Sequence, residues 1–104
     1  MNIKVKNLSG GISNIIINEP KTYNSLSFKN LNDLIKVFKK LDDDRKIKVI
    51  ILEGAGKGFS AGHNLKEVRG LKKRSKYLKL FNLCSKVMLQ IVEGRKPVIA
   101  KVHG

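Results

Sequence analysis

The fold is decided by residues 48–65, which read KVIILEGAGKGFSAGHNL. Residues 49–52 form an uninterrupted aliphatic run, which is typical of a strand that is buried on both faces of a sheet. Residues 54–62 form a glycine-rich loop, and Asn64 can cap a helix that starts at Leu65. The sequence therefore predicts a buried strand, a tight loop and the start of a helix in direct succession.

The residues before this strand predict a hairpin and a helix. Residues 3–6 and 12–17 are rich in Val and Ile, and the turn residues 9–11 lie between them. A loop over 18–26 follows, and Ser27 is in position to be the N-cap of a helix. The acidic residues 42–44 mark the end of that helix. The apolar face of this helix recurs at helical spacing and consists of Leu31, Leu34, Ile35, Phe38 and Leu41.

The residues after the loop predict a longer helix over 72–91 and a last strand over 98–102, separated by Gly94 and Pro97. The expected buried stripe of that helix consists of Tyr77, Phe81, Cys84, Met88 and Ile91. The predicted order is β-β-α-β-α-β, so the fold class is α/β.

Composition favours one globular, cytoplasmic domain. The chain has 104 residues, of which 41% are hydrophobic and 29% charged. No apolar run approaches the ~18 residues of a transmembrane helix, so no membrane span is expected. A single cysteine, Cys84, excludes an internal disulfide and points to a reducing compartment. The first residues lack the apolar segment of a signal peptide.

The net charge of +14 suggests an anionic partner, which could be nucleic acid, an acidic membrane surface or a phosphate-bearing ligand. A lysine-rich composition with many Asn and Ile is also typical of an AT-rich genome, without selection for binding. Aromatic residues make up only 6%, so the stacking platforms of single-strand binders are missing. The basic run over 72–79 is best interpreted as a solvated helix face, with contact to the phosphates of a ligand as the second interpretation and RNA binding as the third.

The glycine-rich loop fails two phosphate-binding motifs. Lys57 is followed by Gly58 where a P-loop needs Ser or Thr, and Phe59 replaces the sixth-position glycine of the dinucleotide fingerprint. Glycines still let the main chain approach a ligand closely, and the first N–H groups of a helix favour negative charge. The loop is therefore either an anion or oxyanion site or an ordinary connection from strand to helix.

The run KGFSAGHNLKE at residues 57–67 resembles the signature of the enoyl-CoA hydratase/isomerase (crotonase) superfamily. Further segments are similar in register: NEP at 18–20, NSLS at 24–27 and KPVIAKVHG at 96–104. The Gly-His-Asn triplet, with FNLCSKVM at 81–88, is similar to the enoyl-CoA hydratase domain-containing protein 3 subgroup. The resemblance spans essentially the whole chain.

This resemblance implies a partial domain over 1–104, the N-terminal half of a spiral of ββα turns that binds acyl-CoA thioesters. Two backbone N–H groups would stabilise an enolate, and the first donor falls on the N–H of His63. The resemblance places the Ala61 carbonyl beside the adenine, Lys66 near the CoA phosphates, and Lys21 and Tyr23 beside CoA. The full expected contact set is Lys21, Tyr23, Ser60, Ala61, Gly62, His63, Asn64, Leu65 and Lys66. No metal and no cofactor besides the substrate's coenzyme A are implied.

Two departures from the family pattern matter. Asn64 replaces the usual Asp and brings no charge. The chain ends at Gly104, before the loop that supplies the second N–H donor and before the catalytic glutamates of hydratases, so we expect it to be inactive alone. Full-length members form trimers or hexamers, and the state of this chain stays open. A basic RNA-binding module and a nonfunctional remnant of a split gene are the alternatives.

Overall fold

The computed structural model describes residues 3–22, 24–56, 58–60 and 74–102. Their elements follow in the order β1 (Ile3–Leu8), the 3-10 turn η1 (Ser9–Gly11), β2 (Ile12–Ile17), the 3-10 turn η2 (Pro20–Thr22), α1 (Phe28–Asp43), β3 (Val49–Gly54), α3 (Arg74–Glu93) and β4 (Val98–Lys101). The predicted α/β class and the order β-β-α-β-α-β are confirmed, and the hairpin turn lies where the glycines predicted it.

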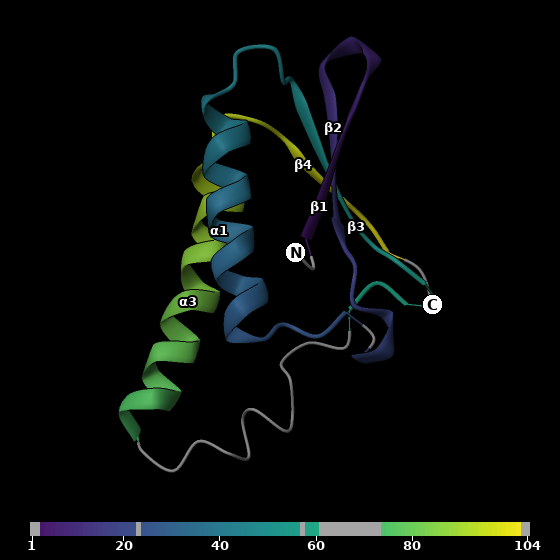
Figure 1. The fold of residues 1–104 in the computed structure, drawn as a ribbon. Coiled ribbons are helices and arrows are strands. Elements are labelled where there is room, and N and C mark those ends of the chain that lie inside the picture. The colour runs from purple at the N-terminus through teal and green to yellow at the C-terminus, as the bar shows by residue number, and fades with distance from the viewer. Residues whose placement is uncertain (1–2, 23, 57, 61–73, 103–104) are drawn as a thin grey trace.

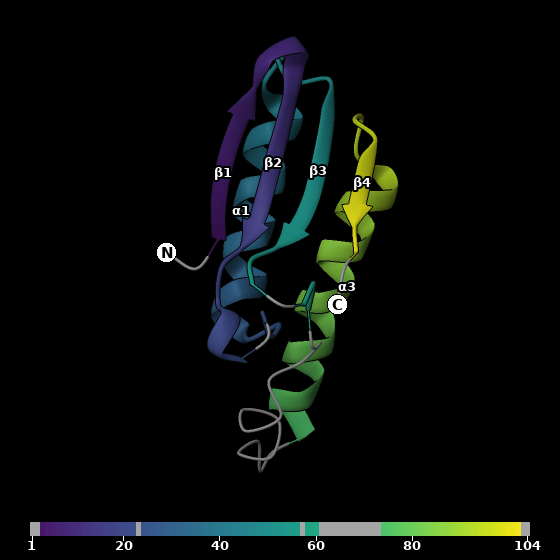
Figure 2. The same cartoon turned by 90° about the vertical axis from the view of Figure 1, so that its right-hand side faces the viewer.

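The four strands form one sheet in the order β1-β2-β3-β4. β1 and β2 pair antiparallel, whereas β2 with β3 and β3 with β4 pair parallel. Both helices lie on the same side of this sheet (Figure 1), and the strands stand side by side in front of them in the perpendicular view (Figure 2). Because β2, β3 and β4 run parallel, their carboxyl ends meet at one edge of the sheet. Residues 18–26 and 54–60 both leave the sheet at that edge.

Helix α1 confirms its predicted cap and most of its predicted face. The hydroxyl of Ser27 accepts a hydrogen bond from the backbone N–H of Asn30 at 3.1 Å, which satisfies one of the free donors of the first turn. At the other end, the Lys96 ammonium donates to the carbonyl of Leu41 in the last turn and to that of Asp44, the C-cap residue. The buried apolar residues of the helix are Leu31, Leu34, Val37, Phe38 and Leu41, while Ile35 is half-buried.

The prediction that β3 is buried on both faces is wrong. It is an inner strand that pairs parallel with both of its neighbours, but only Ile50 of the aliphatic run is buried. Val49 and Ile51 are half-buried on the opposite face. The physical reason is that α1 and α3 cover the same face of the sheet, so the described part of the chain supplies no second layer over the other.

The predicted buried stripe of the second helix is right for Cys84 and Ile91, which pack against the core, and wrong for Phe81 and Met88. Phe81 is 56% exposed and Met88 is 48% exposed, whereas Leu80 and Val87 are each 2% exposed. The side of α3 that packs into the core consists of Leu80, Leu83, Cys84, Val87 and Ile91. This set also has helical spacing, since it follows i, i+3, i+4, i+7 and i+11. A helix that is apolar on most sides has several such stripes, and its packing against α1 selects one of them.

Candidate functional site

The candidate site lies at the carboxyl edge of the parallel strands. The loop over residues 18–26 leaves β2 there, and the loop over residues 54–60 begins at the last residue of β3. The backbone N–H of Ala55 donates to the carbonyl of Ile17 at 2.9 Å, so the two loops start side by side. In open α/β sheets, ligands bind at the carboxyl ends of the strands. This edge is therefore where a ligand is expected.

Asn24 joins the two loops. Its side chain is fully buried, and its Nδ2 donates to the carbonyls of Ala55 at 2.8 Å and Gly58 at 2.9 Å. Within its own loop, its Oδ1 accepts from the backbone N–H of Glu19 at 2.8 Å, and its N–H donates to the Glu19 carbonyl at 2.9 Å. The Ser60 hydroxyl donates to the Asn24 carbonyl at 2.8 Å. Five hydrogen bonds thus converge on one residue.

Asn30 ties the first loop to α1. Its Nδ2 donates to Glu19 Oε2 and to the carbonyl of Ser25, both at 2.8 Å, and its side chain is fully buried. Because Asn30 lies in the first turn of a helix that is itself packed on the sheet, the loop is held at both of its ends.

Gly54 allows the second loop to fold back on the end of β3. A Cβ at this position would lie 2.1 Å from the Phe59 carbonyl oxygen and 2.6 Å from Asn24 Nδ2. Both distances are far below van der Waals contact, so only glycine leaves room for the chain to return so closely. The conformation of the loop that begins at Gly54 therefore depends both on the absence of a side chain at Gly54 and on the hydrogen bonds from Asn24.

The structure places two of the predicted contact residues. Ser60 is half-buried and bound to Asn24, and Lys21 is exposed in the turn η2. Tyr23 and residues 61–66, which include the His63 amide, lie outside the described residues. Sequence reasoning assigned no role to Asn24, although it lies in the NSLS segment that matched the family. The feature of the sequence that could have pointed to Asn24 is its residue type, because asparagine tolerates a positive φ in a loop next to a strand end.

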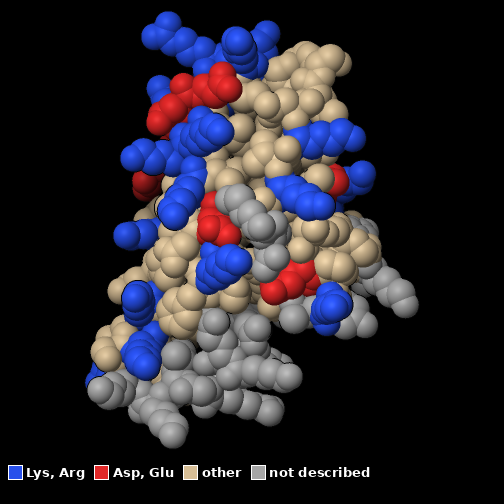
Figure 3. Space-filling model, viewed as in Figure 1, with Lys and Arg blue, Asp and Glu red and all other residues tan. Residues whose placement is uncertain are grey.

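The positive charge of the described residues is spread over the surface, and much of it lies on α1. On the face shown in Figure 3, Lys and Arg side chains are scattered along the α1 side with Asp and Glu between them. The exposed lysines of α1 are Lys29, Lys36, Lys39 and Lys40. Such a distribution is typical of a solvated surface. Of the basic run over 72–79, Arg74, Lys76 and Lys79 are exposed on α3, as a solvated helix face requires, and residues 72–73 lie outside the described residues.

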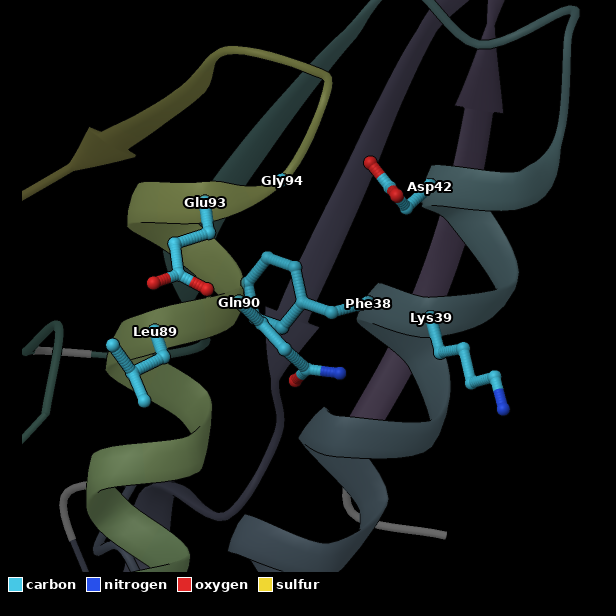
Figure 4. Close-up of a pocket in the computed structure, with 7 residues that line it drawn as sticks. All are labelled: Phe38, Lys39, Asp42, Leu89, Gln90, Glu93 and Gly94. Carbon is cyan, nitrogen blue, oxygen red and sulfur yellow. The ribbon is translucent and has the colours of Figure 1, made fainter.

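A cavity of about 260 Å³ lies elsewhere, between the last turns of α1 and α3 (Figure 4). It is lined by Phe38, Lys39, Asp42, Leu89, Gln90, Glu93 and Gly94. The last turn of α1 leads directly into the amino end of β3, so this cavity is at the opposite end of the sheet from residues 54–60. It is not part of the candidate site.

Metal sites and membrane-spanning helices were also sought among the described residues. They contain no group of three or more His, Cys, Asp or Glu side chains arranged to hold a metal ion. No helix within the described ranges is long and apolar enough to cross a membrane.

Comparison with known proteins agrees with the geometry. Residues 7–104 match the enoyl-CoA hydratase/isomerase family. Human mitochondrial enoyl-CoA hydratase domain-containing protein 3 is 40% identical over 94 residues, which are 90% of this chain and 31% of that protein. Probable enoyl-CoA hydratase 1 of Arabidopsis thaliana, named as peroxisomal, is 35% identical over 98% of this chain and 37% of its own length.

Solved structures extend the similarity to the whole chain. The crystal structure of a Mycobacterium smegmatis enoyl-CoA hydratase has a TM-score of 0.96 and 38% identity, and covers 100% of this chain and 40% of its own. The crystal structure of human enoyl-CoA hydratase domain-containing protein 3 has a TM-score of 0.92 and 38% identity, and the match covers 100% of this chain and 41% of that protein. The chain therefore spans between about a third and two fifths of the length of these relatives. On these matches, it belongs to the enoyl-CoA hydratase/isomerase family and corresponds to the N-terminal part of the fold.

Proposed function

We propose that this chain is the CoA-binding N-terminal portion of an enzyme that converts acyl-CoA thioesters through an enolate, as a hydratase or an isomerase. The observation that carries the proposal is the position of residues 54–56 and 58–60. They are held against the loop over 18–26 at the carboxyl edge of the strands, within a chain of this family. The 57–67 run that continues this loop is the part that resembles the family signature.

In the proposed mechanism, the backbone N–H of His63 donates a hydrogen bond to the thioester oxygen as negative charge develops on it. A backbone donor needs no particular side chain, so the imidazole of His63 has no assigned part. Loss of one such donor typically costs roughly 2.7–4 kcal/mol of transition-state stabilisation. The proposed contacts with coenzyme A come from Lys21 and Tyr23 on the first loop and from residues 60–66 on the second.

The proposal assigns binding, and not turnover, to the 104-residue chain by itself. A second oxyanion donor and an acid and base are needed as well, and the relatives are roughly two and a half to three times as long as this chain. No cofactor is proposed beyond the coenzyme A of the substrate. We propose a cytoplasmic location on the basis of the single cysteine, and cell fractionation of the tagged protein tests it against mitochondria and peroxisomes.

Titration of the ¹⁵N-labelled chain with crotonyl-CoA, a short enoyl-CoA thioester, tests the function. We expect saturable chemical-shift changes in residues 54–66 and around Lys21, and no hydration of the substrate. Lys21→Gln is expected to weaken binding several-fold, because it removes a cation beside the negatively charged coenzyme A. Lys36→Gln removes the same charge from the exposed face of α1 and serves as the matched control.

Two outcomes would contradict the proposal. Tight binding of an RNA oligonucleotide that weakens steeply with salt, without binding of crotonyl-CoA, would identify the chain as an RNA-binding module. A chain that binds neither ligand and aggregates would be a nonfunctional remnant.

A further inference from the structure

We propose that Asn24 is a positioning residue that sets the spacing between the two loops of the CoA site. The inference rests on the proposed function, because it concerns the loops that carry Lys21 and His63. Asn24 itself is buried and is not expected to touch the substrate.

The hydrogen bonds of Asn24 use all of its polar groups. A side-chain amide offers two N–H donors and one carbonyl oxygen. Both donors bind carbonyls of the second loop, those of Ala55 and Gly58, and the oxygen accepts from the N–H of Glu19 in the first loop. The backbone N–H and carbonyl are bound to Glu19 and Ser60. One residue therefore fixes two points of the second loop relative to the first.

The residue type is specified by two independent requirements. The φ of Asn24 is +56°, in the left-handed region that glycine and asparagine adopt most readily. Its side chain must also present two donors and one acceptor at short reach. Glycine meets only the first requirement, aspartate lacks the donors, and glutamine is longer by one methylene group. Asparagine meets both requirements.

The consequence for the site follows from distance along the chain. Lys21 lies three residues before Asn24, and His63 lies three residues after Ser60, which binds Asn24 directly. A shift at Asn24 therefore changes the separation between Lys21, a proposed CoA contact on the first loop, and Ser60, which precedes the proposed donor residue in the sequence. Displacements of about 1 Å in a binding site can reduce catalysis about a hundredfold, so binding should respond strongly as well.

Asn24→Asp and Asn24→Gly test the inference in the full chain. Asn24→Asp keeps the shape but replaces both donors with an acceptor, and Asn24→Gly keeps the backbone conformation but removes the side chain. Asn32→Asp is the matched control, because Asn32 is exposed on α1 and its side chain donates to the local carbonyl of Phe28 at 3.0 Å, within one turn of the helix. Amide hydrogen exchange is measured together with the affinity for crotonyl-CoA.

For both Asn24 variants we expect at least tenfold faster exchange in residues 54–60, unchanged exchange in β1 and β2, and at least tenfold weaker binding of crotonyl-CoA. The Asn32 control should stay within twofold of the unmodified chain. The pattern across the chain separates positioning from general stability. A residue that only stabilises the fold would raise exchange everywhere and leave the affinity of the folded molecules unchanged.

Binding within twofold of the unmodified chain in both Asn24 variants would overturn the inference, as would exchange that rises equally in the loop and in the hairpin. If Asn24→Asp does not fold, Asn24→Gly, which introduces no buried charge, gives the decisive measurement. If the unmodified chain does not bind crotonyl-CoA, the proposed function fails. The exchange of residues 54–60 then still shows whether Asn24 holds the two loops together.

Discussion

Replacing Gly54 with alanine tests the packing of the two loops most directly. The added Cβ would lie 2.1 Å from the Phe59 carbonyl oxygen and 2.6 Å from Asn24 Nδ2. To reach ordinary contact, residues 58–60 must move away by roughly 1 Å. That movement pulls the carbonyl of Gly58 away from Asn24, to which it is bound at 2.9 Å.

The expected cost follows from these contacts. Overpacking of a tight site costs typically 1–3 kcal/mol. The same Cβ crowds Asn24 Nδ2, the donor of both hydrogen bonds to Ala55 and Gly58, so both are weakened, and each contributes about 1 kcal/mol. We therefore expect Gly54→Ala to lower the free energy of unfolding by about 3–5 kcal/mol, which is a large part of the stability of a typical domain.

The assay is urea unfolding followed by far-UV circular dichroism, with the midpoint shifting and the slope unchanged. Gly10→Ala is the control, because a Cβ there meets nothing within 4 Å although φ is +77°. It should cost only the left-handed penalty of about 1–2 kcal/mol. If Gly54→Ala costs no more than this control, residues 58–60 do not pack on the end of β3 and the reasoning is refuted.

Other predictions concern the helices and their ends, each measured by the same unfolding assay. Leu80→Ala should lower the free energy of unfolding by about 2–5 kcal/mol because the side chain is buried, whereas Phe81→Ala should lower it by less than about 1 kcal/mol because Phe81 is exposed. The reverse order would show that Phe81 is buried, as the sequence predicted. Ser27→Ala should cost about 1 kcal/mol through loss of the N-cap, and Ser27→Asp should recover most of it. Lys96→Met should cost about 1–3 kcal/mol, because it removes the donor to the carbonyls of Leu41 and of the C-cap residue Asp44. Arg95→Ala should cost less than about 1 kcal/mol because its side chain is 71% exposed, and equal costs would contradict the capping role of the lysine.

Local features of the chain were predictable because their causes lie within a few residues. The hairpin turn at 9–11 follows from its glycines, and the start of α1 follows from the hydroxyl of Ser27 three residues before the N–H it binds. The end of α3 next to Gly94 and the strand after Pro97 follow in the same way. The motif at 57–67 identified the family because it is a local signature that tolerates change elsewhere in the chain.

Contacts between distant residues were not predictable in this way. The aliphatic run at 49–52 is compatible with burial on one face or on two, and the choice depends on where the helices lie. The face of α3 is decided by α1, since Leu80 and Phe81 are equally suited to a core.

The amino-acid sequence by itself thus determined the class of fold, the succession of elements and the family, through periodicity, caps and a contiguous motif. Only the tertiary structure decided which apolar surfaces are buried and that Asn24 joins two loops. The reason is physical. The hydrogen bonds from Asn24 to Ala55 and Gly58 connect residues 31 and 34 positions apart, and no local propensity specifies a contact that forms only after the sheet has brought both loops to one edge.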